Sequence, residues 1–332
     1  MLYNDSLLSR LEAGLRAVLP AWGMNETANL RLLTFSENAT FLADDNFGGK
    51  LVFRVHRPDY NTEQEIRAEL AWTEALRQDG VVTTPRSIPA IDGRKLVAFR
   101  DGQTERFVVA FEFMPGKEPD IKTGLTRWFG VLGEITARLH VHSRNWVRPE
   151  NFVRKTWSFD TIIGPNAQWG DWRHTPGLDA AGVAVLERVQ ALLERQTAAY
   201  GYAPERFGLV HCDLRPANLL VEGDRMAVID FDDCGLSWYI FDFATAISFM
   251  EHESFVPALM RAWVDGYRQV VQLSTADEAA LPIFVMLRRM QLTAWIGSHG
   301  ETPTAKMMSD DYVRGTVALA AQYLRAHELE AM

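Results

Sequence analysis

Short runs of alternating hydrophobic and polar residues fill the first third of the chain, and this alternation is typical of β-strands with one buried face. A helical pattern interrupts these runs over residues 62–78, where apolar side chains recur every three or four positions and Thr62 is the expected N-cap. A second amphipathic helix is expected within residues 1–24. The predicted strands are residues 29–35, 40–43, 50–56, 95–99 and 106–113, with hairpin turns at residues 46–49 and 101–102.

The pattern becomes mainly helical after Met114-Pro115-Gly116. Residues 144–176 interrupt it with no clear period, and residues 207–233 read as three short strands separated by a polar loop and a turn at 222–224. We therefore expect an α+β protein with a small antiparallel β-rich lobe over residues 1–112 and a larger, mostly helical lobe over residues 113–332. The predicted helices of the second lobe are residues 124–142, 178–200, 255–271, 278–299 and 304–327.

Composition narrows the class of protein. With 47% hydrophobic and 23% charged residues among 332, extensive disorder is excluded. No apolar run approaches the roughly 18–20 residues of a membrane-spanning helix. The net charge of −9 argues against nucleic acid or an anionic membrane as partner. Two cysteines, Cys212 and Cys234, provide no disulfide framework, so we expect a cytoplasmic protein; its oligomeric state is not indicated.

A cluster of polar residues within residues 207–233 is the strongest candidate for chemistry. His211, Asp213 and Asn218 follow one apolar strand, and Asp230 ends another. The turn at residues 222–224 should bring Asn218 and Asp230 to the same end of a hairpin. An amide oxygen and a carboxylate that converge there, with Asp213 nearby, suit Mg²⁺ and phosphate oxygens. We therefore expect phosphoryl transfer.

The same segment resembles the kinase superfamily. His211-x-Asp213-x-x-x-x-Asn218 has the spacing of a kinase catalytic loop, and Asp230 stands at the position of the metal-binding aspartate. The short passage from Asp230 to Asp242-Phe243-Ala244 lacks the long activation segment of protein kinases. The chain is therefore most similar to the aminoglycoside phosphotransferase and choline kinase family, and especially to its RdoA-type stress-response kinases and type II homoserine kinases. Weaker similarities are the hinge-like stretch 111–116 and Ser36-Glu37-Asn38, which replaces a glycine-rich loop.

This resemblance implies a bilobal protein-kinase-like fold, ATP as phosphoryl donor and Mg²⁺ as cofactor. By position, Asp213 would accept or orient the proton of the acceptor hydroxyl as a base of ordinary carboxylate strength, and Arg215 would stabilise charge. Asn218 and Asp230 would hold Mg²⁺. The nucleotide-binding residues would be Ser36, Val52 above the adenine ring, the backbone between Glu112 and Met114 at the adenine edge, and the phosphate-gripping pair Arg54 and Glu69.

Arg54 departs from the family pattern, which has a lysine at this point of the third strand. Alternation along the strand places Val52 and Arg54 on one face. Arginine keeps the charge but has a planar, forked head in place of a compact ammonium. Its expected partner is Glu69, with Glu65 one helical turn earlier as the alternative.

Several residues near the motif can be explained by structural roles rather than catalytic ones. We expect His211 and Asp242 to brace the catalytic loop, and both cysteines to be small packing residues. Asp232 and Asp233 could extend the metal site or be solvated. The tryptophans of residues 144–176 could line an acceptor site or anchor an irregular segment.

The acceptor stays open at this point. The preferred acceptor is a hydroxyl of a small metabolite, such as an amino alcohol, a homoserine-like amino acid or an aminoglycoside-like amine. The resemblance to RdoA-type kinases, which includes His56-Arg57-Pro58 and Leu292-Thr293-Ala294-Trp295, implies a protein Ser/Thr side chain instead. A third alternative, motivated by Arg54, is a catalytically silent nucleotide-binding protein.

Overall fold

The computed structural model describes residues 5–36, 38–45, 49–120, 123–300 and 302–330, so Glu37 and most of the predicted turn at 46–49 lie outside it. The chain divides into two compact units. The first comprises Met1–Gly116 together with Arg148–Val153, and the second comprises Lys117–Val147 and Arg154–Met332. The short segment 148–153 returns to the first unit, where the carbonyl oxygen of Asn151 accepts a hydrogen bond from Nε2 of Gln64 at 3.1 Å. The sequence pattern gave no sign of this return.

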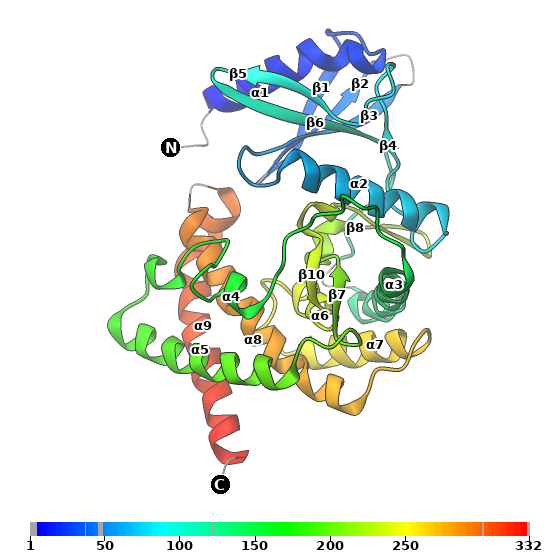
Figure 1. The fold of residues 1–332 in the computed structure, drawn as a ribbon. Helices are drawn as coiled ribbons and strands as arrows, with labels where there is room; N and C mark the ends of the chain where they lie inside the picture. Colours follow the sequence, from blue (N-terminus) through cyan, green and yellow to red (C-terminus); the bar gives the residue numbers. More distant parts are fainter. Residues whose placement is uncertain (1–4, 37, 46–48, 121–122, 301, 331–332) are drawn as a thin grey trace. The chain divides into compact units, whose positions relative to one another are not determined.

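The first unit is built on one antiparallel sheet (Figure 1). Its strands run in the order β1-β2-β3-β6-β4, and β5 pairs with β6 beside β4. Strand β4 was not predicted, because two residues are too few to show alternation. The strands are β1 (Asn29–Phe35), β2 (Ala39–Asp44), β3 (Lys50–Val55), β4 (Ser87–Ile88), β5 (Val97–Asp101) and β6 (Thr104–Glu112).

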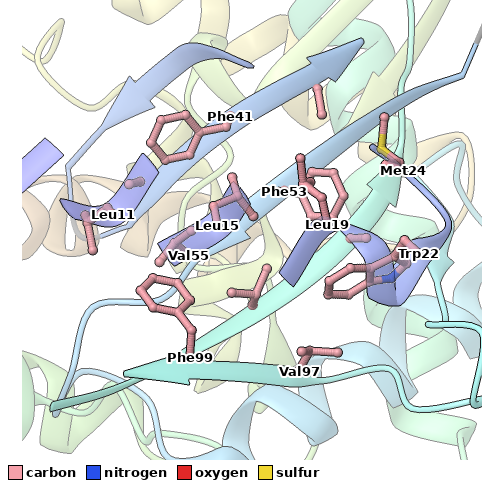
Figure 2. Packing of buried hydrophobic residues seen from close by; sticks show 14 of the residues in the cluster. Leu11, Leu15, Leu19, Trp22, Met24, Phe41, Phe53, Val55, Val97 and Phe99 are labelled. Atoms are coloured by element: carbon pink, nitrogen blue, oxygen red, sulfur yellow. The ribbon is translucent and has the colours of Figure 1, made fainter. Parts of the chain in front are cut away.

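Helices α1 (Asp5–Val18) and α2 (Glu63–Gln78) cover opposite faces of this sheet (Figure 1). Leucines of α1 and of the following 3₁₀ turn, Leu19–Trp22, pack on Phe53 and Phe99, and the ring of Trp22 meets that of Phe53 edge to face at 5.1 Å (Figure 2). The other face packs on α2, whose N-terminus is fixed by a capping box between Thr62 and Glu65.

The second unit is mostly helical and contains two small antiparallel strand pairs, β7 with β10 and β8 with β9. Its five long helices fall within about three residues of the predicted ranges, whereas the short helix at Phe159–Ile162 lies in the segment for which no helix was predicted. The α+β class with a β-rich first part and a helical second part is confirmed. In the described part of the chain, no helix is long and apolar enough to span a membrane. The elements are α3 (Leu125–Asn145), α4 (Phe159–Ile162), α5 (Ala180–Tyr200), β7 (Phe207–Val210), β8 (Leu219–Glu222), β9 (Arg225–Val228), β10 (Gly235–Trp238), α6 (Phe241–Ala246), α7 (Val256–Arg268), α8 (Thr275–Ser298) and α9 (Pro303–Glu330).

Glycines allow α3 and α7 to contact each other backbone to backbone. A Cβ atom placed on Gly133 would lie 2.0 Å from the carbonyl oxygen of Trp263, and one on Gly266 would lie 1.9 Å from the carbonyl oxygen of Gly130. A carbonyl within a packed helix cannot move aside without shifting the helix. The spacing of these two helices therefore depends on the missing side chains.

We expect Gly133→Ala to lower the free energy of unfolding by about 1–3 kcal/mol or more, because the added methyl group overpacks this contact. Gly130→Ala is the matched control on the same helix, since its Cβ would meet its nearest neighbour at an ordinary 3.7 Å. That control should be neutral or slightly stabilising, as alanine favours helix over glycine. Urea unfolding of the two variants tests the contrast, and equal stabilities would contradict it.

Candidate active site

The Asp213 carboxylate lies just after β7 and receives three hydrogen bonds. Its Oδ2 atom accepts from Nδ2 of Asn218 at 2.7 Å and from Nε of Arg215 at 3.2 Å. Its Oδ1 atom accepts from Nη2 of Arg288 at 2.9 Å. The first two donors come from the same loop, while Arg288 comes from the middle of α8. The structure thus brings together three of the predicted residues and adds a fourth that was not predicted.

Two arginines determine the ionisation of Asp213. Burial raises its pKa, but the charges of Arg215 and Arg288 oppose burial and leave the pKa below its ordinary value of 3.8. The group is therefore an ionised carboxylate and a weaker base than an exposed aspartate. The expectation of ordinary carboxylate strength is wrong in this respect, because Arg288 could not be placed from the sequence.

The backbone that carries Asp213 is held by a second carboxylate, Asp242 at the start of α6. Its two oxygens accept the amide N–H groups of His211 at 3.2 Å and Cys212 at 2.8 Å. Cys212 has a left-handed φ of 67°, which is costly for a residue with a side chain. The imidazole of His211 accepts the amide of Asp213 through Nδ1 and lies 3.2 Å from the carbonyl oxygen of Ile229 through Nε2. The bracing roles expected of His211 and Asp242 are confirmed.

Asp242 has a third partner, the buried imidazole of His140 on α3. The His140 Nε2 atom lies 3.0 Å from the Asp242 carboxylate, and Nδ1 lies 3.0 Å from the hydroxyl of Tyr267 on α7. Burial lowers the pKa of His140 and outweighs the opposing effect of Asp242. The ring is therefore neutral at pH 7, and it links two helices to the loop.

The hairpin of β8 and β9 brings Asn218 and Asp230 to one end, as the turn predicted. The amide of Ile229 donates to the carbonyl oxygen of Asn218 at 2.9 Å, and Asp230 follows with a left-handed φ of 63°. The Nδ2 atom of Asn218 donates to Asp213. The Oδ1 atom of Asn218 accepts no hydrogen bond from the described residues, so it can face a cation. An amide oxygen next to a half-buried carboxylate fits a hard divalent cation.

The described residues hold no group of three or more His, Cys, Asp or Glu side chains arranged around a metal ion. A site of one amide and one carboxylate is nevertheless typical of Mg²⁺, which usually takes its remaining ligands from water and substrate phosphates. The donor set therefore fits the predicted metal.

The residues after Asp230 are anchored through their carbonyl oxygens. Arg154 donates to the carbonyls of Asp232 and Cys234, and the indole of Trp157 donates to that of Asp233 at 2.8 Å. Asp232 is buried, so it is not the solvated residue that one alternative supposed. Cys212 and Cys234 are both buried thiols, which agrees with their expected packing role.

In the first unit, Arg54 and Glu69 form a buried ion pair. Nη1 of Arg54 donates to Oε1 of Glu69 at 2.7 Å and to Oε2 at 2.9 Å, and the guanidinium lies 5.1 Å from the ring centre of Phe111. Glu65 instead accepts the amide and hydroxyl of Thr62 in the capping box. The structure selects Glu69 over Glu65, because Glu65 lies in the first turn, where helix N–H groups lack partners.

The other predicted nucleotide-binding residues lie at three places in the first unit. Val52 packs on the α2 side of the sheet, the face that Arg54 also occupies. Ser36 follows β1 and donates its amide to the carbonyl oxygen of Asn38 at 3.1 Å. Half-buried Met114 follows β6.

Glu112 is already engaged by its neighbours. Its amide donates to the carbonyl of Arg86 at 2.9 Å, and its carboxylate accepts the Arg86 amide and lies 3.0 Å from Nη1 of Arg77. The amide and the carboxylate of Glu112 are therefore already bonded to other residues of the first unit.

The sequence pattern of the phosphotransferase enzyme family matches residues 35–273. The chain belongs to this family. Membership confirms the predicted resemblance and the predicted class of enzyme, a kinase with an alcohol group as phosphoryl acceptor. Within that class the phosphotransferase groups with kinases of small molecules.

Three relatives illustrate the range of similarity to this phosphotransferase. The solved structure of a microcompartment-associated aminopropanol kinase is 44% identical and superposes with a TM-score of 0.88, over 94% of this chain and 97% of that one. Amicoumacin kinase from Bacillus subtilis is 22% identical over 68% of this chain and 67% of its own length. A homoserine kinase from Gluconobacter oxydans is 29% identical over 46% of this chain and 47% of its own.

Arg288 is the site residue of the phosphotransferase that sequence reasoning missed. It is buried, and its guanidinium lies 5.1 Å from the ring centre of Trp169, one of the tryptophans in the irregular segment 144–176. The available signal was the pair Arg288-Arg289 within an otherwise apolar stretch of α8. Charged residues inside a buried helix need partners, which was a reason to look for a buried carboxylate.

We expect Glu69→Gln to lower the free energy of unfolding of the phosphotransferase by about 3 kcal/mol, because it removes the charge that neutralises buried Arg54. Glu65→Gln on the same helix is the matched control, since glutamine also serves in a capping box. Thermal and urea unfolding of both variants measure the difference. A Glu65 variant as unstable as the Glu69 variant would contradict the assignment.

Acidification should destabilise the folded protein through His140. Its folded pKa lies below 6.5. Below pH 6.5 the unfolded chain therefore binds a proton that the folded chain does not, and stability falls by up to about 1.4 kcal/mol per pH unit. Between pH 6.5 and 5.5, wild type should lose more stability than His140→Asn in urea unfolding, by up to about 1 kcal/mol. Parallel pH dependences for the two proteins would show that His140 does not titrate in this way.

Proposed function

We propose that this phosphotransferase uses ATP and Mg²⁺ to phosphorylate the hydroxyl of a small amino alcohol of the aminopropanol type. The observation that carries the chemistry is the ionised Asp213 carboxylate, held by Asn218 and two arginines at the end of the β8–β9 hairpin. The acceptor class is supported by the 44% identity to an aminopropanol kinase over almost the whole chain.

In the proposed reaction, the acceptor hydroxyl donates a hydrogen bond to Asp213 and its oxygen attacks the γ-phosphorus of ATP. A new O–P bond forms, the bond from the γ-phosphorus to the bridging oxygen breaks, and ADP leaves. Because the pKa of Asp213 is lowered, the carboxylate acts mainly by orienting the hydroxyl, and it receives the proton only late in the transfer. Such a role is enough for a transition state that needs little deprotonation of the attacking group.

Mg²⁺ would be held by Oδ1 of Asn218 and by the Asp230 carboxylate, and would neutralise charge on the phosphates when bound. Asn218 then has two functions, since its Nδ2 atom donates to Asp213 at 2.7 Å. The Asn218 side chain would thereby fix the metal and the Asp213 carboxylate at a constant distance from each other. Arg215 supplies a nearby positive charge for the transferring group.

The first unit would supply the nucleotide contacts. Arg54, held by Glu69, would bind phosphate oxygens, while Val52 would pack on the adenine and Ser36 would approach the phosphates. Since the amide of Glu112 already donates to Arg86, the contacts to the adenine edge would come from the carbonyl of Glu112 and the backbone of Phe113 and Met114. The arginine in place of lysine keeps its ion pair to a helix glutamate, and this supports an active enzyme over the silent alternative.

A panel of hydroxyl compounds with labelled ATP and Mg²⁺ tests the proposal. We expect phosphoryl transfer to 1-amino-2-propanol with higher kcat/KM than to homoserine, choline, an aminoglycoside or a Ser/Thr peptide. Asp213→Asn should reduce this transfer by about 10³-fold or more, because it removes the charge that orients the hydroxyl. The same variant should retain stabilisation by ATP in a thermal-shift assay.

The controls separate the alternatives. Asp230→Ala should lose the Mg²⁺-dependent part of the thermal shift. Wild type that gains no Mg²⁺-dependent stability from any nucleotide would refute the kinase chemistry. Wild type that binds ATP but transfers to no acceptor would favour the silent alternative, and preferred transfer to the peptide would favour a protein kinase.

A further inference from the structure

Arg288 is held in place by parts of the second unit that are far apart in the sequence. Its Nε atom donates to the hydroxyl of Ser248 at 3.0 Å, and Nη1 donates to Oε1 of Gln291 at 3.0 Å. The ring of Trp169 lies along the guanidinium, at 5.1 Å. These contacts leave Nη2 to donate to Oδ1 of Asp213 at 2.9 Å. The guanidinium is therefore fixed in a single orientation toward this carboxylate.

The hydrogen bonds of Asp213 determine where an acceptor hydroxyl can bind. Each carboxylate oxygen has two lone pairs. Oδ2 already receives Asn218 and Arg215, whereas Oδ1 receives only Arg288 among the described residues. The remaining lone pair for a hydroxyl donor is therefore on Oδ1, the same oxygen that Arg288 holds.

We propose that Arg288 is a positioning residue that fixes Oδ1 of Asp213 for the acceptor hydroxyl. This inference rests on the proposed function, since it takes Asp213 as the group that meets the acceptor. Arg288 acts through Asp213: it prevents rotation of the carboxylate, so that the free lone pair keeps one direction. Loss of the Arg288 guanidinium would let the Asp213 carboxylate rotate. Small displacements of a catalytic group lower the reaction rate by large factors.

The neighbouring arginine shows what a purely structural role looks like. Arg289 is equally buried, but its partners are Glu251, the hydroxyl of Thr316 and the carbonyl oxygen of Tyr312. None of these belongs to the predicted catalytic set. The two arginines therefore form a matched pair on one helix, with only Arg288 bonded to Asp213 in the described structure.

Arg288→Lys and Arg289→Lys, made in the full chain, test the proposal. Lysine keeps the charge but cannot satisfy Ser248, Gln291 and Asp213 together. We expect Arg288→Lys to lower kcat for transfer to 1-amino-2-propanol by about 10²-fold, with KM for ATP and the Mg²⁺–ATP thermal shift within about twofold of wild type. Arg289→Lys should lower the melting temperature but leave kcat within about twofold.

Ser248→Ala provides a second, milder variant. It should lower kcat by about fivefold, since one hydrogen bond from the guanidinium to a neutral hydroxyl is lost and the guanidinium is less well oriented. In the Arg288→Lys background the same change should have little further effect, because both act on one orientation. Wild-type kcat in Arg288→Lys, or equal losses in both arginine variants, would overturn the positioning role.

ATP hydrolysis, with water as acceptor, distinguishes failure of this inference from failure of the proposed function. If wild type hydrolyses ATP but phosphorylates no amino alcohol, the proposed acceptor is wrong. The role of Arg288 is then tested by the rate of ADP release, which should be lower in Arg288→Lys than in wild type; an equal rate would overturn the role. If wild type neither transfers nor hydrolyses, the proposed function fails and the role of Arg288 fails with it.

Discussion

The buried carboxylate of Asp242 is the constraint on which the candidate active site depends. Two backbone N–H groups of the catalytic loop and one imidazole nitrogen converge on its oxygens. A carboxylate without solvent is stable only when donors surround it, so Asp242 requires the loop to present its amides inward. That requirement maintains the left-handed conformation of Cys212 and sets the direction in which Asp213 leaves the loop.

Charge is arranged differently around the predicted site residues of each unit. Around Asp213 two arginines meet one carboxylate, which leaves an excess of positive charge for a phosphoryl group to neutralise. In the first unit, Arg54 meets one carboxylate, and the pair is balanced. An arginine at the position where the family has a lysine therefore keeps the charge and the ion pair to Glu69.

Much of the fold and part of the site were predictable because their signals are local. Strand alternation placed Val52 and Arg54 on one face, and the hairpin turn brought Asn218 to Asp230. Arg288 was not predictable, since its contact with Asp213 spans 75 residues and depends on how α8 packs. The choice of Glu69 over Glu65 likewise required the capping interaction at Thr62, which competes for the earlier carboxylate.

The return of residues 148–153 to the first unit has a consequence for how the chain can be divided. The backbone passes between the units after Gly116, after Val147 and after Val153. A fragment that stops at Gly116 would lack the strand-free segment whose Asn151 carbonyl accepts the side chain of Gln64 on α2. A single cut therefore cannot release either unit whole, and neither is a module that could be exchanged between relatives as one continuous piece.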